Sequence, residues 1–163
     1  MEKLKPLEEV CQPDVRYRNR VDLDHSTGTI NEATIESIYR VIEPIQLRAN
    51  VPEEVRSHFE IARNLALYSW FVYSFNVVAA MQAYSSLEMA LKRKARKKRI
   101  ELKKSLAQSF RGRQLASELG PTIDLSDAIA YLRNDLAHGN SMMHGQGIDA
   151  LELCAELINE LFA

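Results

Sequence analysis

The 163-residue sequence predicts an all-α protein, an up-and-down helical bundle of four to five helices. Apolar residues recur at helical spacing in several segments, and residues 55–99 contain neither glycine nor proline. No segment alternates apolar and polar residues clearly enough to predict a strand on its own. The length is that of one ordinary domain, and 46% hydrophobic with 26% charged residues is the composition of a folded globular chain.

We expect residues 1–50 to form an N-terminal extension that contains one helix. Apolar residues between 15 and 23 keep a rough period of two, which fits either a short strand or an extended arm. From Asn31, which could cap a helix, apolar residues recur at helical spacing until Pro44 ends the run. The two patterns consist of Val15, Tyr17, Val21 and Leu23, and of Ile35, Ile38, Tyr39 and Ile42.

The bundle itself is expected over residues 51–163 and begins with two antiparallel helices. Pro52 is tolerated in the first turn of a helix, and Glu53 and Glu54 complement the positive end of the helix dipole. The aromatic and β-branched residues at 69–73 are the place where we expect the turn between the two helices.

Neither a membrane span nor a secretion signal is predicted. Residues 65–83 approach the length of a transmembrane helix and precede a basic run, but polar residues interrupt them, so we expect a buried bundle core instead. Cys11 and Cys154 match no disulfide or metal spacing, and the N-terminus has no apolar signal segment. We therefore expect a cytoplasmic protein with no membrane partner. The interrupting polar residues are Ser69, Ser74, Asn76 and Gln82.

Three further helices are predicted towards the C-terminus. The first spans residues 106–119 and ends at Gly120-Pro121. The second is capped by Asp124 and ends before Gly139. Its apolar stripe consists of Leu125, Ile129, Leu132 and Leu136, and the third helix, residues 148–162, buries Leu151, Cys154, Ala155, Ile158 and either Leu161 or Phe162.

Charge is distributed unevenly along the chain. Residues 92–104 hold nine basic residues and one acidic residue, a net charge of +8, whereas the remainder holds 12 basic and 21 acidic residues. Such a run is either a solvated helix face or an anion-binding patch, and the run alone favours neither.

The segment YLRNDLAHG, residues 131–139, carries the groups best suited to chemistry. On a helix, Arg133, Asn134 and His138 point away from the leucine stripe, with Tyr131 on the same face. Arginine can bind phosphate through two hydrogen bonds, and histidine exchanges protons near neutral pH. The plain alternative, which spacing alone favours, is that Arg133 and His138 only oppose the negative end of the helix dipole.

The sequence RNDLAH resembles the HEPN signature, an arginine followed by a polar residue, usually asparagine, with a histidine four to six residues after the arginine. EMALKR, residues 88–93, is similar to a second feature of that family, a glutamate followed after three residues by Lys-Arg on an earlier helix. The resemblance covers roughly residues 52–162 and implies a helical, typically dimeric protein. Most proteins with this signature are metal-independent endoribonucleases or toxins, whereas some members bind nucleotides or partners without catalysis.

The resemblance also implies roles for individual residues. His138 would act as acid or base when the ribose 2′-hydroxyl attacks the neighbouring phosphate, and Arg133 would stabilise charge on the phosphoryl oxygens. Asn134 would orient His138 or the phosphate. Glu88 would fix Arg133 or the Lys92-Arg93 pair, and its plain alternative is an ordinary i,i+4 salt bridge to Lys92.

The expected partners follow from the same resemblance. They are RNA, a second copy of the chain in a homodimer and, for a toxin, an antitoxin protein; no cofactor or metal is expected. A tyrosine two residues after the histidine is the modified residue in toxins that pair with a nucleotidyltransferase antitoxin, and Asn140 stands there instead. The alternative function is a non-catalytic HEPN adaptor that binds RNA, a nucleotide or a protein. The residues expected to contact the RNA backbone are Lys94, Arg96, Lys97, Lys98 and Arg99.

Overall fold

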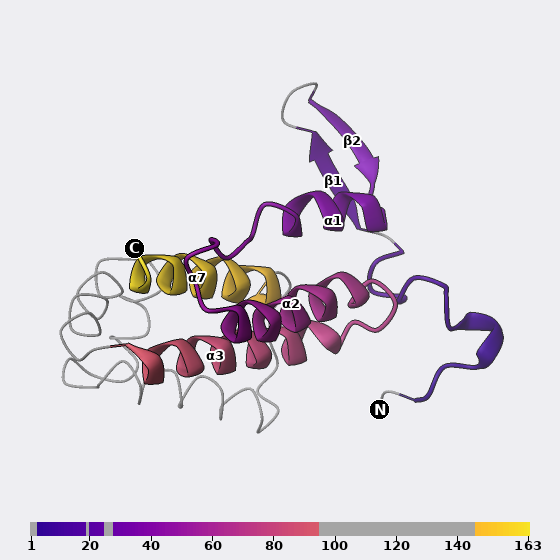
Figure 1. Ribbon diagram of the computed structural model, residues 1–163. Coiled ribbons are helices and arrows are strands. Elements are labelled where there is room, and N and C mark those ends of the chain that lie inside the picture. The colour runs from indigo at the N-terminus through magenta and orange to yellow at the C-terminus, as the bar shows by residue number, and fades with distance from the viewer. Residues whose placement is uncertain (1–2, 19, 25–27, 95–145) are drawn as a thin grey trace, which may run out of the picture.

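The computed structural model describes residues 3–18, 20–24, 28–94 and 146–163, and this part of the chain is mostly helical (Figure 1). The helices predicted over residues 106–119 and 125–138 lie outside the described residues. The described elements are the short 3₁₀ helix η1 (Leu7–Glu9), the strands β1 (Val21–Asp24) and β2 (Thr29–Glu32), and the helices α1 (Ile35–Ile42), α2 (Glu53–Tyr68), α3 (Phe75–Arg93) and α7 (Gln146–Leu161).

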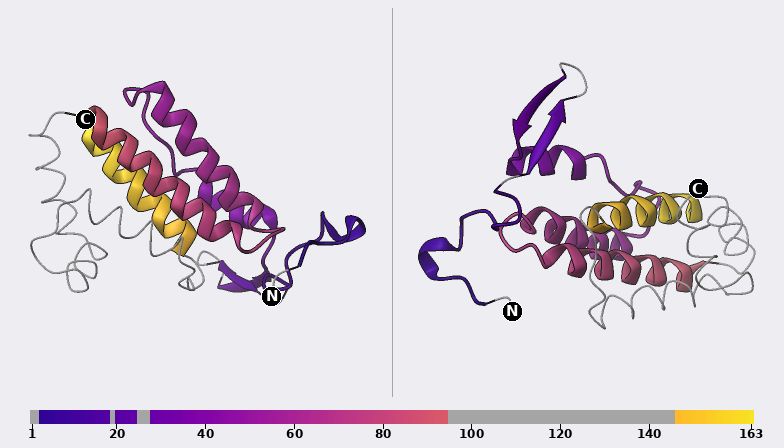
Figure 2. Two further views of the ribbon diagram at one scale, coloured as in Figure 1. Left: turned by 90° about the horizontal axis from the view of Figure 1, so that it is seen from below. Right: turned by 180° about the vertical axis from the view of Figure 1, so that it is seen from behind.

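Three long helices form the body of the described chain, with α3 packed along both α2 and α7 (Figure 2). A short turn at residues 69–74 reverses the chain, so α2 and α3 are antiparallel as predicted. Helix α7 runs parallel to α3, because Gly147 contacts Asn76 at one end and Lys94 lies over Phe162 at the other. The helix-rich fold is thereby confirmed.

The core between these helices combines small and large side chains. Buried alanines of α2 and α3 let the helices of the body pack closely, and leucine and isoleucine side chains of α7 are buried against them. Each fully buried large apolar side chain contributes about 1.5–3 kcal/mol to stability. The alanines are Ala62, Ala66, Ala79, Ala80, Ala83 and Ala90, and the largest fully buried apolar side chains include Phe59, Leu87, Leu151, Ile158 and Leu161.

The last helix matches its prediction closely. Leu151, Cys154, Ala155 and Ile158 are buried, and of the two candidates at the end Leu161 is buried whereas Phe162 is only partly covered. Burial raises the pKa of the Cys154 thiol, so this side chain stays protonated and acts as part of the apolar core. Residues 65–83 are divided between the end of α2, the turn and the start of α3, and none of the described helices combines the length and apolar character needed to cross a membrane.

The N-terminal segment contains a β-hairpin that the sequence pattern does not predict in full. Strand β1 covers only the end of the stretch where a strand or an arm is expected, because residues 15–18 form turns, and it pairs antiparallel with β2, with Leu23 opposite Ile30. Asn31 pairs with Asp22 in this hairpin, so its prediction as a helix cap is wrong. The cap is Thr34, whose hydroxyl accepts a hydrogen bond from the Ser37 amide at 3.2 Å.

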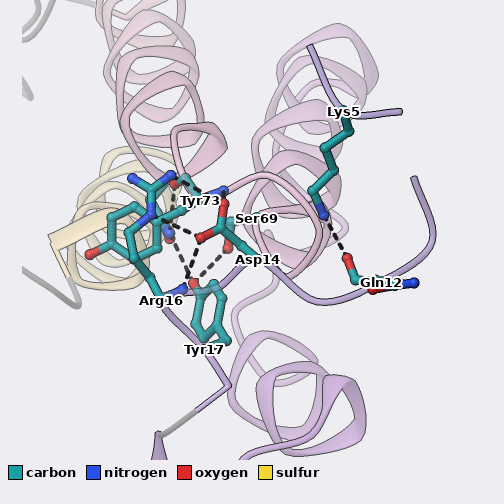
Figure 3. A network of polar contacts seen from close by, with 8 residues as sticks. Lys5, Gln12, Asp14, Arg16, Tyr17, Ser69 and Tyr73 are labelled. Carbon is teal, nitrogen blue, oxygen red and sulfur yellow. Dashed lines mark hydrogen bonds and ion pairs between the residues drawn. The ribbon is translucent and has the colours of Figure 1, made fainter. Parts of the chain in front are cut away.

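Asp14 fastens the N-terminal segment to the turn between α2 and α3 (Figure 3). Its carboxylate accepts hydrogen bonds from the Tyr73 amide at 3.1 Å, the Arg16 amide at 3.0 Å and the Arg16 guanidinium at 2.9 and 3.1 Å. The Asp14 amide donates to the Trp70 carbonyl at 2.8 Å. Asp14 therefore connects backbone and side-chain donors from two parts of the chain that are far apart in sequence.

Tyr17 completes this junction from the same segment. The Ser69 hydroxyl donates to the Ala66 carbonyl at 2.7 Å, so the Tyr17 hydroxyl donates to Ser69 Oγ at 3.0 Å. Tyr17 in turn accepts a hydrogen bond from Asn76 Nδ2 at 3.0 Å. The buried hydroxyl is thus satisfied as donor and acceptor, and its ring packs against Trp70.

The first prediction concerns the charge on Asp14. Burial raises the pKa of this carboxyl, but the hydrogen bonds from Arg16 and Tyr73 lower it by more, so the net pKa lies below the ordinary 3.8. A carboxyl with a lowered folded-state pKa adds stability above its unfolded pKa and loses it as the pH falls through the folded pKa. Asp14→Asn should lower the free energy of unfolding at pH 7 by about 1–3 kcal/mol.

Urea unfolding of both proteins between pH 7 and pH 2.5 measures this. The difference between wild type and Asp14→Asn should shrink as the pH falls below about 4, because the wild-type carboxyl then becomes protonated. The control is Asp22→Asn, which removes a more exposed carboxylate 3.7 Å from Arg20 and should change stability little. A difference that stays constant over the whole pH range would contradict this role of the Asp14 charge.

The second prediction concerns the close approach of α7 to α3. A Cβ atom at Gly147 would lie 2.9 Å from both the carbonyl oxygen and the side-chain oxygen of Asn76. Glycine to alanine in a helix normally stabilises by up to about 1 kcal/mol, whereas forcing an atom into a packed contact costs about 1–3 kcal/mol. Gly147→Ala should therefore lower the thermal unfolding midpoint, and a raised midpoint would show that the two helices do not need this contact.

Candidate functional site

The structure describes one part of the predicted site and not the other. Glu88, Lys92, Arg93 and Lys94 lie at the C-terminal end of α3, within the described residues. The remaining predicted site residues lie outside the described residues, and they are Tyr131, Arg133, Asn134 and His138 of the signature and Arg96, Lys97, Lys98 and Arg99 of the basic run. We refer to Lys92, Arg93 and Lys94 together as the basic end of α3.

Glu88 forms the i,i+4 ion pair with Lys92 that the sequence offers as its plain alternative role. The Glu88 carboxylate lies 2.8 Å from Lys92 Nζ, and the Glu88 side chain is 23% exposed against 72% for Lys92. The pair follows from the helix itself, since residues four apart stand on one face. The predicted contact of Glu88 with Arg133 falls on residues outside the described chain and stays a prediction.

Arg93 forms an ion pair with Glu54 of α2, a contact that sequence reasoning missed. Because α2 and α3 are antiparallel, the first turn of α2 lies beside the last turn of α3. Both side chains are well exposed, Arg93 at 47% and Glu54 at 64%. The sequence did contain a signal for this contact. When two helices pair antiparallel across a short turn, the first turn of the first helix lies beside the last turn of the second, so acidic residues in one and basic residues in the other can form ion pairs.

Lys94 ends α3 and contacts the last turn of α7. Its backbone is extended, at φ −102° and ψ 153°, so the chain leaves the helix at the point where the basic run continues. The Lys94 ammonium lies 4.5 Å from the centre of the Phe162 ring, a cation–π contact. Phe162 was predicted only as an alternative core residue, and it is partly buried against the core.

The same end of the bundle is closed by the segment that leads into α2. The Arg48 amide donates to Asn159 Oδ1 at 2.8 Å, and Asn50 Nδ2 donates to the Phe162 carbonyl at 2.6 Å. The start of α2, the end of α3 and the end of α7 therefore meet around the basic end of α3. The backbone that carries Lys92, Arg93 and Lys94 is therefore held by contacts with α2 and α7.

The chemistry available at the basic end of α3 is electrostatic. Three cations are accompanied by the carboxylates of Glu54 and Glu88, and the cations oppose the negative end of the α3 dipole. Lysine and arginine bind phosphate, arginine through two parallel hydrogen bonds. In the described ranges, no group of three or more His, Cys, Asp or Glu side chains is placed to hold a metal ion.

His58 belongs to a second polar cluster between α2 and α3. Its Nδ1 lies 2.8 Å from Ser86 Oγ, and the Ser86 hydroxyl donates to the Gln82 carbonyl at 2.9 Å. The direction of the hydrogen bond between His58 and Ser86 depends on the tautomer of His58, since Gln82 Nε2 also lies 3.2 Å from Nδ1. Ser86 is 0% exposed, so this pair is an interhelical hydrogen bond within the bundle and not an accessible nucleophile.

Comparison of the chain with models of protein families, with curated proteins and with solved structures found no match in any of the three. The residues of this chain alone therefore carry the functional proposal. They are the basic end of α3 with its acidic neighbours, and the Arg133-Asn134 and His138 signature further along the chain.

Proposed function

We propose that this protein binds RNA through the basic end of α3 and the basic run that continues from it, and cleaves the bound strand with Arg133, Asn134 and His138. The observation that carries the binding step is the meeting of Lys92, Arg93 and Lys94 at one end of the bundle. From there the chain continues a run whose net charge over residues 92–104 is +8. A phosphate backbone is the polyanion that such a run suits, since bound lysines and arginines release its counterions.

The cleavage step rests on the resemblance of RNDLAH to the HEPN signature. The 2′-oxygen attacks the adjacent phosphorus as its proton is removed, the bond to the 5′-oxygen breaks, and the leaving oxygen is protonated. His138 serves as acid or base in these proton transfers, and Asn134 orients it. Arg133 stabilises the charge that develops on the phosphoryl oxygens, a contribution of about 3–4 kcal/mol for a well-placed donor.

A homodimer is the form in which this chemistry is most effective. On the helix predicted from the sequence, Arg133 and His138 would point away from the leucine stripe, and charges exposed to bulk water are weak in transition-state stabilisation. Two copies paired about a two-fold axis would bring both sets together and exclude part of the water. For a toxin of this type an antitoxin protein would be the further partner, and we propose the cytoplasm as the compartment.

The second candidate function is a non-catalytic HEPN adaptor that binds RNA, a nucleotide or a protein. One observation favours it: the basic end of α3 presents three cations beside the start of α2 and the end of α7, which is enough for anion binding. Anion binding by the basic end of α3 requires none of the signature residues. The two functions therefore differ in whether the bound strand is cut.

The third prediction separates these two functions. Purified protein incubated with mixed RNA in EDTA should give products that end in 2′,3′-cyclic phosphate. His138→Ala should lower the cleavage rate by about 10²–10⁴-fold, because an acid–base group is lost, while the oligomeric state is unchanged. Its matched control is His144→Ala, which removes an imidazole six residues away and should leave cleavage intact. RNA that is bound but uncut, across several substrates, would favour the adaptor.

The fourth prediction concerns the basic run. The affinity for single-stranded RNA should fall with salt at a log–log slope of about −0.7 per phosphate contact. Replacing Lys94, Lys97 and Lys98 together with Gln should flatten the slope by up to about 2, as measured by fluorescence anisotropy at several salt concentrations. The control changes Lys3, Lys5 and Arg18 to Gln, which removes the same charge elsewhere. Binding that is independent of salt and of both substitutions would make the run a solvated face.

A further inference from the structure

We propose that Glu54 competes with the RNA backbone for Arg93, so that this arginine contacts phosphate only by leaving its carboxylate partner. The inference rests on the proposed RNA binding and names a residue that regulates it. It assigns Glu54 a function that the sequence motif does not contain, because Glu54 lies on α2 and outside the segment EMALKR.

The exposure of the pair allows the exchange. Arg93 and Glu54 are 47% and 64% exposed, so a ligand can reach the guanidinium without unfolding either helix. An ion pair of this kind is weak, because water screens it and two long side chains must be held in place. A phosphate can bind the same guanidinium nitrogen, Nη2 of Arg93, that the carboxylate contacts.

The position of Glu54 keeps the free-energy cost of separating it from Arg93 small. It stands in the first turn of α2, where the positive end of the helix dipole favours a carboxylate whether or not Arg93 is present. The contrast is Glu88, which is only 23% exposed and holds Lys92 on its own helix. Of the two pairs at the basic end of α3, the one between α2 and α3 is therefore the one that a ligand displaces.

The competition selects for a chain of phosphates over a single anion. A lone phosphate must displace Glu54 with one contact, and the gain is nearly offset by the lost pair. A strand that contacts Lys94 at the same time brings its next phosphate to Arg93 at high local concentration. The ligand class is therefore an oligonucleotide strand, and inorganic phosphate should compete with it poorly.

A matched pair of variants tests this. Glu54→Gln keeps the side-chain shape and frees Arg93, whereas Glu53→Gln removes the same charge from the neighbouring residue. With a single-stranded RNA oligonucleotide, Glu54→Gln should raise affinity by about twofold to fivefold, since the contact of Arg93 with phosphate then forms without breaking a weak ion pair. Glu53→Gln should change affinity less than about twofold, because an exposed charge that does not contact Arg93 acts on the RNA only at a distance, where salt screens it.

Arg93→Gln completes a double-mutant cycle. It should lower affinity less than about twofold in the wild type and cancel the whole gain in the Glu54→Gln background. Equal gains from Glu54→Gln and Glu53→Gln, or equal losses from Arg93→Gln in both backgrounds, would overturn the inference while RNA binding stands. A wild type that binds no RNA at any salt concentration would remove the proposed function together with the inference, and far-UV circular dichroism of each variant confirms that it is folded.

Discussion

The packing of α3 between α2 and α7 is the constraint on which the other features depend. Alanine-rich surfaces let α2 and α3 approach closely, and Gly147 lets the start of α7 come against Asn76. With α2 antiparallel and α7 parallel to α3, one end of the body collects the start of α2 and the ends of the other two helices. The contacts of Arg93 with Glu54 and of Lys94 with Phe162 follow from that register.

Much of this fold was predictable from local sequence signals. Three local signals predicted features that the structure confirms. Pro52 marked the start of α2, the aromatic cluster at 69–73 marked the turn, and an apolar stripe marked the buried face of the last helix. The hairpin was not predictable to the same degree, because a four-residue strand shows too few alternations to be told from the start of a helix. The fastening role of Asp14 depends on donors almost sixty residues away, such as the Tyr73 amide, and no local pattern contains them.

In the candidate site, too, local contacts were predictable from the sequence and contacts between helices were not. The Glu88 pair with Lys92 is local and was foreseen as one of two roles, whereas the Glu54 pair with Arg93 requires the antiparallel register of two helices. The consequence for function is that counting basic residues overstates the free positive charge. Lys92 and Arg93 have carboxylate partners, so two of the three cations at the basic end of α3 are already paired.

Hydrogen–deuterium exchange of the full chain, with and without a single-stranded RNA oligonucleotide, tests the central claim most directly, because it needs no substitution and reports on every peptide. If the basic end of α3 and the run after it hold the strand, RNA should slow exchange in peptides that cover residues 88–104. The junction around Asp14 at the other end of α3 should be unchanged. Protection that is absent from residues 88–104 and present around Asp14 would contradict the account.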